Sequence, residues 1–286
     1  MTKLAQYQNG NCLVRLHSDG TKFREWDGIP NPVFPESIDL KITDYCDAGC
    51  TWCHEKSTVR GVHGDALKML NLVNQLPAGV ELAIGGGNPL DLPGLDDFLH
   101  EIGACGLIPN LTVNGVHIRN LNWKTRGLVY GLGISWVKGK EYEILDKWDD
   151  RTVLHVIAGV HNPLDILNFS PEKLLILGYK DFGFGKKHNP EMIRANIWKW
   201  RYFMSALCQR VNIVAFDNLA LDQLHVREMV TKQVWKNRFM GQDGEFTMYI
   251  DGVKEEFAAT STSQRHPIGN LSIKEMFAQV RNNVSR

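Results

Sequence analysis

Three cysteines lie close together in the segment Cys46-Asp47-Ala48-Gly49-Cys50-Thr51-Trp52-Cys53. Thiolates are soft ligands, suited either to zinc or to an iron–sulfur cluster. Three thiolates leave one metal position open, and a structural zinc site is normally closed by a fourth ligand, which His54 or His63 can supply. The cluster therefore predicts a metal site, with zinc and iron–sulfur standing about equal on residue types alone.

The CxxxCxxC spacing, with an aromatic residue directly before the last cysteine, resembles the signature of the radical S-adenosylmethionine (SAM) superfamily. The resemblance implies that Cys46, Cys50 and Cys53 bind three irons of a [4Fe–4S] cluster, and that SAM chelates the fourth iron through its amino and carboxylate groups. It implies that Trp52 lies near the adenine. It also implies an oxygen-sensitive enzyme that receives electrons from a reductant such as flavodoxin or ferredoxin. SAM would be cleaved to methionine and a 5′-deoxyadenosyl radical, which abstracts a hydrogen atom from a substrate.

A glycine-rich turn follows the second expected strand, with the sequence Gly85-Gly86-Gly87-Asn88-Pro89. Glycines allow the backbone to approach a ligand closely, and the proline then turns the chain. The turn resembles a variant of the superfamily's GGEP motif, which binds the SAM amino group. Asn88 stands where the family has glutamate, so the contact made by this side chain is in question.

Three further positions gain their meaning from the resemblance and from their order along the chain. Asn114 lies in Thr112-Val113-Asn114-Gly115, which resembles a TNG-like segment with one residue inserted, and is expected to hydrogen-bond SAM or to stabilise a turn. Ser135 ends the fourth expected strand, where the family places contacts to the SAM ribose and carboxylate. Ile157, on the fifth, matches an apolar segment that packs against adenine, although a purely core position is the simpler interpretation.

The elements that must position these residues follow a regular rhythm. Short apolar strands are expected over 38–42, 80–84, 111–113, 128–134, 153–157 and 174–177. Helices or long crossovers separate them, which is typical of a parallel sheet covered on both faces. Right-handed crossovers predict an α/β fold, specifically a partial (β/α)6 TIM-like barrel with its functional loops at the carboxyl ends of the strands.

Helices are predicted by apolar residues at helical spacing. Asp65 is expected to cap one helix, another spans about 95–102, and a long tryptophan-rich helix is expected over 191–209. Trp198, Trp200 and Tyr202 alternate with basic residues on this last helix. A buried core stripe is the favoured interpretation, and a nucleic-acid platform is the alternative.

Composition limits the classes of function. Acidic and basic residues balance to a formal net charge of zero, so nucleic-acid binding is not indicated. No apolar run approaches the roughly 20 residues that span a bilayer, and the first residues lack a signal-peptide core. A cytoplasmic protein without a membrane partner is expected. Cys12, Cys105 and Cys208 are isolated, which argues against an auxiliary cluster. The other three cysteines are crowded into the eight residues 46–53, which in a reducing compartment favours metal binding over disulfides.

Three units are expected along the chain: an N-terminal extension at 1–35, a radical SAM partial barrel at 36–215, and a C-terminal cap at 216–286 with a strand near 246–250. The last unit faintly resembles the SPASM or twitch extensions of peptide-modifying radical SAM enzymes but lacks their cysteines. A peptide or protein side chain is therefore weakly favoured as the substrate. A nucleoside or other small molecule, a glycyl radical enzyme activase, and a non-catalytic zinc-binding module are the alternatives.

The sequence offers fewer candidates for catalytic side chains than for cofactor-binding residues. Lys180 follows the sixth expected strand and can meet a carboxylate, and Arg265 can clamp a carboxylate or phosphate through two hydrogen bonds. Tyr249, Asp217 and Asn218 are the other polar residues of interest. A solvated lysine and a surface salt bridge at Arg265 are the simpler interpretations.

Overall fold

One ten-stranded sheet organises the computed structural model, which describes residues 2–284. The strands lie in the order β10-β9-β8-β7-β6-β5-β4-β11-β12-β13, and the first eight of these are parallel. The bounds of the parallel strands are β4 Ser37–Thr43, β5 Glu81–Gly86, β6 Ile108–Asn114, β7 Gly131–Ser135, β8 Thr152–Ile157, β9 Lys173–Leu177, β10 Ile213–Phe216 and β11 Thr247–Asp251. The six strands expected from the sequence are confirmed as β4–β9, and the sheet has two further parallel strands at its sides.

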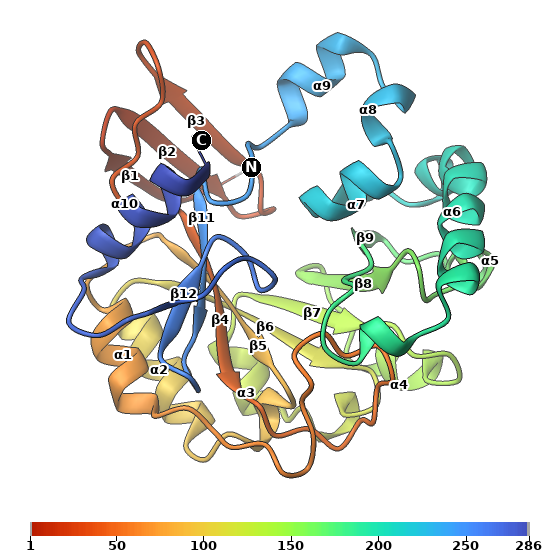
Figure 1. Ribbon diagram of the computed structural model, residues 1–286, viewed down its shortest axis with the longest axis horizontal. Helices are drawn as coiled ribbons and strands as arrows, with labels where there is room; N and C mark the ends of the chain where they lie inside the picture. Colours follow the sequence, from red (N-terminus) through yellow and green to blue (C-terminus); the bar gives the residue numbers. More distant parts are fainter. Residues whose placement is uncertain (1, 285–286) are drawn as a thin grey trace.

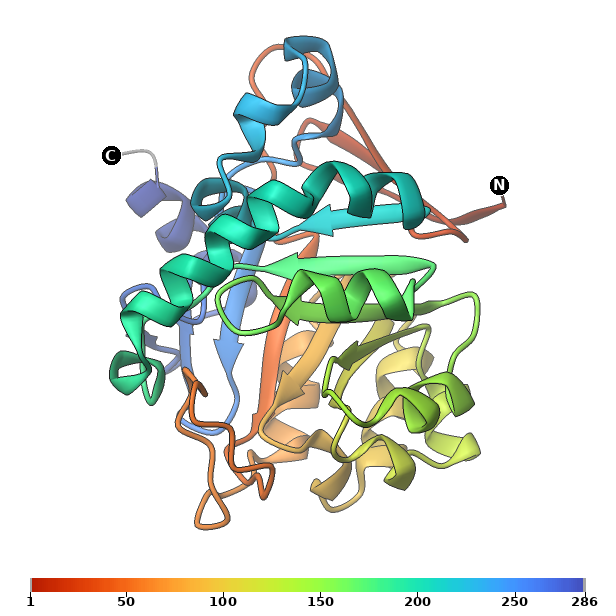
Figure 2. The same cartoon turned by 90° about the vertical axis from the view of Figure 1, so that its right-hand side faces the viewer.

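Helices alternate with the parallel strands, as the sequence rhythm predicts. Their bounds are α1 Ala66–Val73, α2 Leu95–Ala104, α3 Trp123–Leu128, α4 Glu141–Asp146, α5 Pro163–Phe169, α6 Pro190–Arg210, α7 Asn218–Gln223, α8 Val226–Met229, α9 Lys232–Arg238 and α10 Ile273–Val284. Helices α1, α2 and α3 pack side by side, and α5 packs on α6. In Figures 1 and 2 the strands curve, and these helices lie outside the curve. None of the described helices combines the length and apolar character that a bilayer crossing requires.

Alternation along β4 separates two faces of the sheet. Ile38, Leu40 and Ile42 are at most 1% exposed and belong to the main hydrophobic core. Asp39 and Lys41 therefore point to the opposite, inner face, because successive side chains of a strand alternate. This inner face carries the polar groups described below.

The N-terminal extension forms a small antiparallel sheet of its own. Its strands are β1 Lys3–Asn9, β2 Cys12–His17 and β3 Lys22–Trp26, paired in that order. The turn expected at Gly20 joins β2 to β3, and its φ of 86° is a conformation that glycine adopts readily. Arg24 binds the fully buried Glu36 at 2.7 Å, which fastens this sheet to the chain just before β4.

Helix α6 corrects the expectation of an aromatic core stripe. Trp200 is fully buried, but Trp198 is 64% exposed and Tyr202 is 68% exposed. Residues two apart on a helix point to nearly opposite sides, whereas residues four apart share a face. Trp198 and Tyr202 accordingly stack on each other at the surface, with ring centroids 5.7 Å apart.

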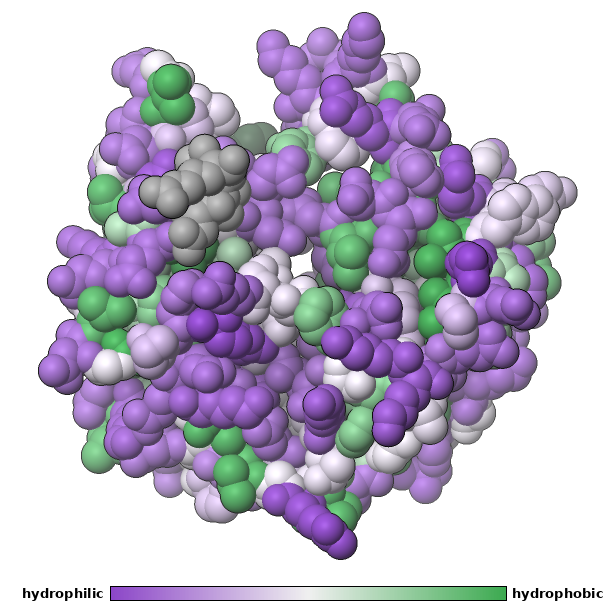
Figure 3. All heavy atoms as spheres, in the orientation of Figure 1, coloured by the Kyte–Doolittle hydropathy of each residue, from purple (hydrophilic) through white to green (hydrophobic). Residues whose placement is uncertain are grey.

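The C-terminal segment, expected as a cap, supplies strands to the main sheet. β11 pairs in parallel with β4, and β12 Glu256–Ala258 and β13 His266–Pro267 continue the sheet in antiparallel fashion. Figure 1 shows β11 and β12 in blue beside the orange-red β4, so segments from the two ends of the chain meet here. In the space-filling view, the surface is indented between the N-terminal strands and α9 (Figure 3).

Candidate functional site

The three clustered cysteines lie on a loop, residues 44–58, that leaves the carboxyl end of β4; we call it the cysteine loop. Its two ends are tied together, because Cys46 N donates to Thr58 O at 3.0 Å and Thr58 N donates to Asp44 O at 3.2 Å. Within the loop, Cys53 N donates to Cys50 O at 3.2 Å. The loop therefore leaves and returns at the same place, the carboxyl end of β4. We call these two hydrogen-bonded ends the neck of the loop.

All three thiols are partly buried and free of disulfides. Burial, and then the negative charge of the neighbouring Cys53 and Cys46 thiolates, raise the pKa of Cys50 to about 11. Burial also raises the pKa of Cys46. Metal binding requires the thiolate form, so a metal that binds these cysteines would displace protons from them.

The glycine-rich turn packs directly against the neck of the cysteine loop. Gly87 N donates to Thr43 O at 2.8 Å, and Asn88 N donates to Tyr45 O at 2.7 Å. A Cβ atom on Gly87 would lie 2.1 Å from Tyr45 O. The turn and the cysteine loop are thus in direct contact, and glycine is needed at position 87 for that close approach.

Gly87→Ala is expected to destabilise the protein by about 1–3 kcal/mol, the usual cost of overpacking a close backbone contact. The new methyl group would meet a backbone oxygen that cannot rotate away, so the turn or the loop neck must move. Thermal unfolding checks this. Gly127→Ala in α3 is the matched control, since a Cβ there meets no atom within 4 Å and alanine favours a helix. Equal melting temperatures for Gly87→Ala and the wild type would contradict the prediction.

Asn88 and Pro89 occupy the end of the glycine-rich turn. Asn88 is 1% exposed; its Oδ1 accepts from Leu90 N at 3.4 Å, and its Nδ2 donates to Asp91 Oδ2 at 2.7 Å. Pro89 is buried and opens a short 3₁₀ helix, Pro89–Asp91. The Asn88 side chain thus caps its own turn.

Asn114 and Ser135 lie at adjacent strand ends. Asn114 Nδ2 is 3.9 Å from Cys50 Sγ, and Asn114 Oδ1 accepts from Val116 N at 3.0 Å. Ser135 O accepts from Gly115 N at 2.9 Å. The asparagine therefore stabilises a turn, as one of its two expected roles requires, and its amide also faces the cysteine loop.

Trp52 and Ile157 are connected through a histidine that the sequence did not single out. Ile157 N donates to His161 Nδ1 at 2.8 Å, and the rings of His161 and Trp52 meet edge to face with centroids 6.2 Å apart. Burial lowers the pKa of His161 to about 4, so its ring is neutral at pH 7. Its accepting Nδ1 implies that Nε2 carries the proton.

Lys180 contacts the C-terminal segment rather than open solvent. Lys180 Nζ donates to Ser261 Oγ at 2.8 Å, and Ser261 Oγ is 3.1 Å from His54 Nε2. Burial, and then the Lys180 charge, lower the pKa of His54 to about 3. A neutral imidazole can accept here, so the chain of hydrogen bonds runs from Lys180 through Ser261 to His54.

Tyr249 and Arg265 converge on Glu55, which lies two residues beyond Cys53. Tyr249 Oη donates to Glu55 Oε1 at 3.0 Å, and Arg265 Nη2 is 3.4 Å from the same oxygen. The Arg265 side chain is only 22% exposed, so the surface salt bridge considered for it is wrong. The guanidinium also lies 4.1 Å above the Tyr249 ring, a cation–π arrangement.

Lys41 and Asp251 also belong to the group of charged side chains around Glu55. The sequence did not indicate either of them as a site residue. The Lys41 side chain is 2% exposed, and its Nζ lies 3.0 Å from Glu55 Oε2, 2.9 Å from Asp251 Oδ2 and 2.6 Å from Asp44 Oδ1. The Asp251 side chain is 1% exposed. Burial by itself would lower the pKa of Lys41, but these carboxylates outweigh it and hold that pKa above its usual range.

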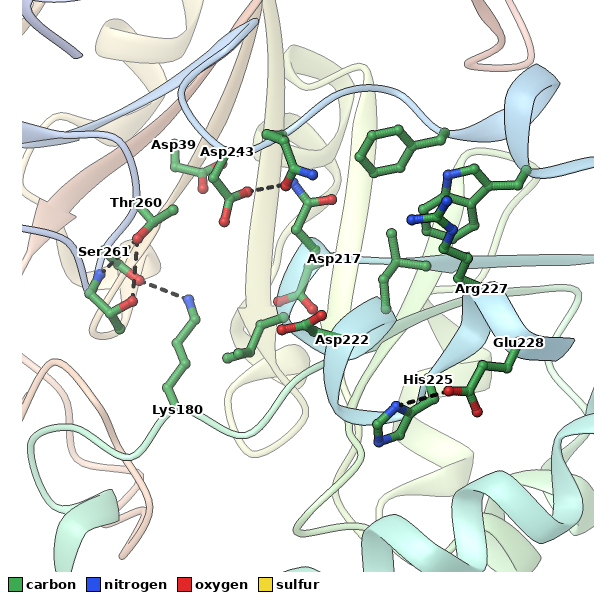
Figure 4. Close-up of a pocket in the computed structure, with 17 residues that line it drawn as sticks. Asp39, Lys180, Asp217, Asp222, His225, Arg227, Glu228, Asp243, Thr260 and Ser261 are labelled. Atoms are coloured by element: carbon green, nitrogen blue, oxygen red, sulfur yellow. Dashed lines mark hydrogen bonds and ion pairs between the residues drawn. The ribbon is translucent and has the colours of Figure 1, made fainter. Parts of the chain in front are cut away.

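A cavity of about 550 Å³ lies next to Lys180 and Ser261. Asp39, Asp217 and Asp243 also line it, together with Trp235 and Phe239 of the C-terminal part. Figure 4 shows Lys180 pointing toward Ser261, with the side chains of Asp39 and Asp243 near each other. Asp39 is exposed to the cavity, and the protein that surrounds the cavity raises the pKa of its carboxyl group by reducing its solvation. The volume is within the usual range for a ligand pocket.

The donor set of three thiols on one loop suits an iron–sulfur cluster, and it suits zinc where a fourth ligand joins it. Three thiols share one loop, and a second cavity of about 530 Å³ borders Cys46 and Cys50. Each of the two candidate fourth zinc ligands uses one ring nitrogen in a hydrogen bond: His54 Nε2 with Ser261 Oγ, and His63 Nδ1 with Thr43 Oγ1 at 2.8 Å. A histidine that binds a metal commonly hydrogen-bonds through its other ring nitrogen, so these bonds do not exclude zinc. Among residues 2–284, no three ligand side chains are gathered closely enough to form a preassembled metal site.

Comparison with solved structures assigns the fold. The structure of Streptococcus suis SuiB bound to S-adenosylmethionine matches with a TM-score of 0.60 and 11% identity, covering 87% of this chain and 68% of that chain. SuiB bound to its precursor peptide SuiA matches with a TM-score of 0.59 and 11% identity, over 86% of this chain and 65% of that chain. This chain has the SuiB fold. It spans about two thirds of the SuiB length. No protein-family model and no curated protein sequence matches the chain.

Proposed function

We propose that this chain is a radical SAM enzyme that binds one [4Fe–4S] cluster through Cys46, Cys50 and Cys53. The observation that carries the proposal is the meeting of the cysteine loop with the glycine-rich turn, joined by two backbone hydrogen bonds, in a chain that shares the fold of a SAM-bound structure. The bound cluster and SAM would supply reductive cleavage of SAM and hydrogen-atom abstraction. The protein's own part is to hold SAM, to exclude water and oxygen, and to position the substrate.

SAM is proposed to lie along the carboxyl ends of β5–β8. Gly85, Gly86 and Gly87 would offer their backbone to its amino group, Asn114 and Ser135 would contact its polar parts, and Trp52 with Ile157 would enclose its adenine. Support comes from the link between Trp52 and Ile157 through His161 and from the approach of Asn114 to Cys50. Asn88 is proposed to support the turn, because its side chain already caps it.

The substrate is proposed to be a peptide or protein side chain that enters the cavity beside Lys180. SuiB was solved with a precursor peptide, which supports this choice without establishing it for the present chain. Lys180 has two ammonium protons besides the one donated to Ser261, and they can orient a substrate acceptor. Tyr249 and Arg265 do not line this cavity and are proposed to act from beside it, where Arg265 contacts Ser261. A nucleoside or another small molecule is the second candidate, since the cavity volume also suits one.

The experiment is anaerobic purification, reconstitution with iron and sulfide, and incubation with SAM and dithionite. Formation of 5′-deoxyadenosine, measured by chromatography, together with about four irons per chain, is the expected result for a [4Fe–4S] enzyme. Flavodoxin or ferredoxin should be able to replace dithionite. A colourless protein that retains one zinc per chain and forms no 5′-deoxyadenosine would overturn the proposal in favour of a zinc-binding module.

A further inference from the structure

Glu55 occupies an unusual place for a charged side chain on a loop. It lies on the cysteine loop immediately after Cys53 and His54, yet its side chain is only 11% exposed. Both of its oxygens are bonded: Oε1 accepts from Tyr249 Oη, and Oε2 accepts from Lys41 Nζ, each at 3.0 Å. A buried carboxylate is costly unless it is paired and hydrogen-bonded, and Glu55 is both.

The partners of Glu55 come from distant parts of the chain. Lys41 belongs to β4, Tyr249 belongs to β11, and Arg265 lies on the segment between β12 and β13. Lys41 also binds Asp251 of β11 at 2.9 Å. Charge-assisted hydrogen bonds of this kind are stronger than neutral ones and fix the geometry of their partners. The end of the cysteine loop is therefore fastened to the inner face of two adjacent parallel strands.

A second contact also joins the cysteine loop to the C-terminal segment. His54, between Cys53 and Glu55, has its Nε2 atom 3.1 Å from Ser261 Oγ. Arg265 Nη2 donates to Ser261 O at 2.5 Å, so the segment that meets His54 is itself held by the arginine that meets Glu55. Both residues that follow Cys53 are thus bonded to the C-terminal segment, with 207 positions separating His54 from Ser261.

We propose that Glu55 is a positioning residue, and that residues 247–265 act through it to hold the end of the cysteine loop against the sheet. The C-terminal segment would then be part of the metal site's framework rather than a cap over it. The consequence for an iron–sulfur cluster rests on the proposed function. The restraint on the loop itself does not, and it can be measured without any metal.

The test is the rate at which iodoacetamide alkylates each cysteine of the iron-free full chain, followed by mass spectrometry. In Glu55→Gln, alkylation of Cys50 and Cys53 is expected to rise about tenfold, the effect of losing one charge-assisted hydrogen bond on a local opening equilibrium. Cys12, which is fully buried in the N-terminal sheet, reports global unfolding and should not change. Cys208 on α6 is exposed and serves as an internal reference for the rate of alkylation in each variant.

Glu255→Gln is the matched control. Glu255 lies on the same C-terminal segment, and the substitution makes the same chemical change in its exposed ion pair with Lys68 of α1. Unchanged Cys50 and Cys53 rates in Glu55→Gln would overturn the proposal, and so would a parallel rise at Cys12. If Glu55→Gln does not fold, Tyr249→Phe removes a single hydroxyl from the same carboxylate and should raise the same two rates. A chain that binds no iron in any variant, but shows the selective rise, would refute the proposed function and leave the restraint standing.

Discussion

Replacing Cys50 with alanine is expected to abolish 5′-deoxyadenosine formation, to below about 1% of the wild-type yield, because thiolate ligands hold such clusters and two cannot replace three. Cys50 is the central cysteine of the loop and the one that Asn114 approaches, at 3.9 Å. The loss should be one of metal binding rather than of folding, since Cys50 is only partly buried and lies on a loop. Iron content after reconstitution, thermal unfolding of the iron-free protein and chromatography of the products measure the three effects separately.

Cys208→Ala provides the matched comparison. Cys208 is an exposed cysteine on α6, remote in sequence from the loop, so the same substitution should leave both iron content and 5′-deoxyadenosine yield unchanged. A Cys50→Ala protein that keeps the wild-type iron content would contradict the assignment of the loop as the cluster ligand. Retention of stoichiometric zinc by the wild type, with its loss in Cys50→Ala, would instead favour the zinc-binding alternative.

The main sheet was predictable where its strands carry a clear apolar pattern. β4 was expected from the alternation of apolar and charged residues, and β5–β9 from short apolar runs. Asp65 was expected to cap α1, which it does by accepting from Lys68 N at 3.1 Å. β10 was missed because four residues after a long helix carry little periodic signal. β1 was missed because its residues are largely polar and exposed, so neither face of the strand indicates a core.

The position of β11 could not be derived from its own residues. A strand near 246–250 was expected, but its pairing with β4 joins residues about 200 positions apart, and local patterns do not specify such a partner. This pairing brings Tyr249 and Asp251 beside Lys41. The C-terminal segment consequently contributes to the site from within the sheet, which a linear division into barrel and cap does not anticipate.

The part of the candidate site that lies at the carboxyl ends of the parallel strands was predictable. The cysteines, the glycine-rich turn and Asn114 each follow a parallel strand, so the topology brings them to one edge. Lys41 and Glu55 were missed for a specific reason. The alternation along β4 indicates only that Lys41 lies opposite the core face, and such a position is ordinarily solvated; its burial to 2% depends on β11 and the cysteine loop, which cover it.

Replacing Lys41 with methionine is expected to lower the free energy of unfolding by about 3–5 kcal/mol, the usual cost of leaving a buried charge without its partner. Lys41 Nζ bonds both Glu55 and Asp251, whose side chains are 11% and 1% exposed. Without the ammonium group, the buried carboxylates of Glu55 and Asp251 keep Arg265 as their shared cation, at the longer distances of 3.4 and 3.7 Å. For a chain of this size the melting temperature should fall by about 5–8 °C.

Lys68→Met makes the same substitution in an exposed ion pair with Glu255 and should cost less than about 1 kcal/mol. The double variant Lys41→Met with Asp251→Asn tests the cause. Its new amide removes the unpaired charge, while the amide oxygen can still accept from Val253 N and Lys254 N as the Asp251 carboxylate does. The double variant should recover at least about 1 kcal/mol relative to Lys41→Met alone, as coupled neighbours do. A double variant as unstable as the sum of its single changes would show that packing of the lysine stem, and not its charge, stabilises this region.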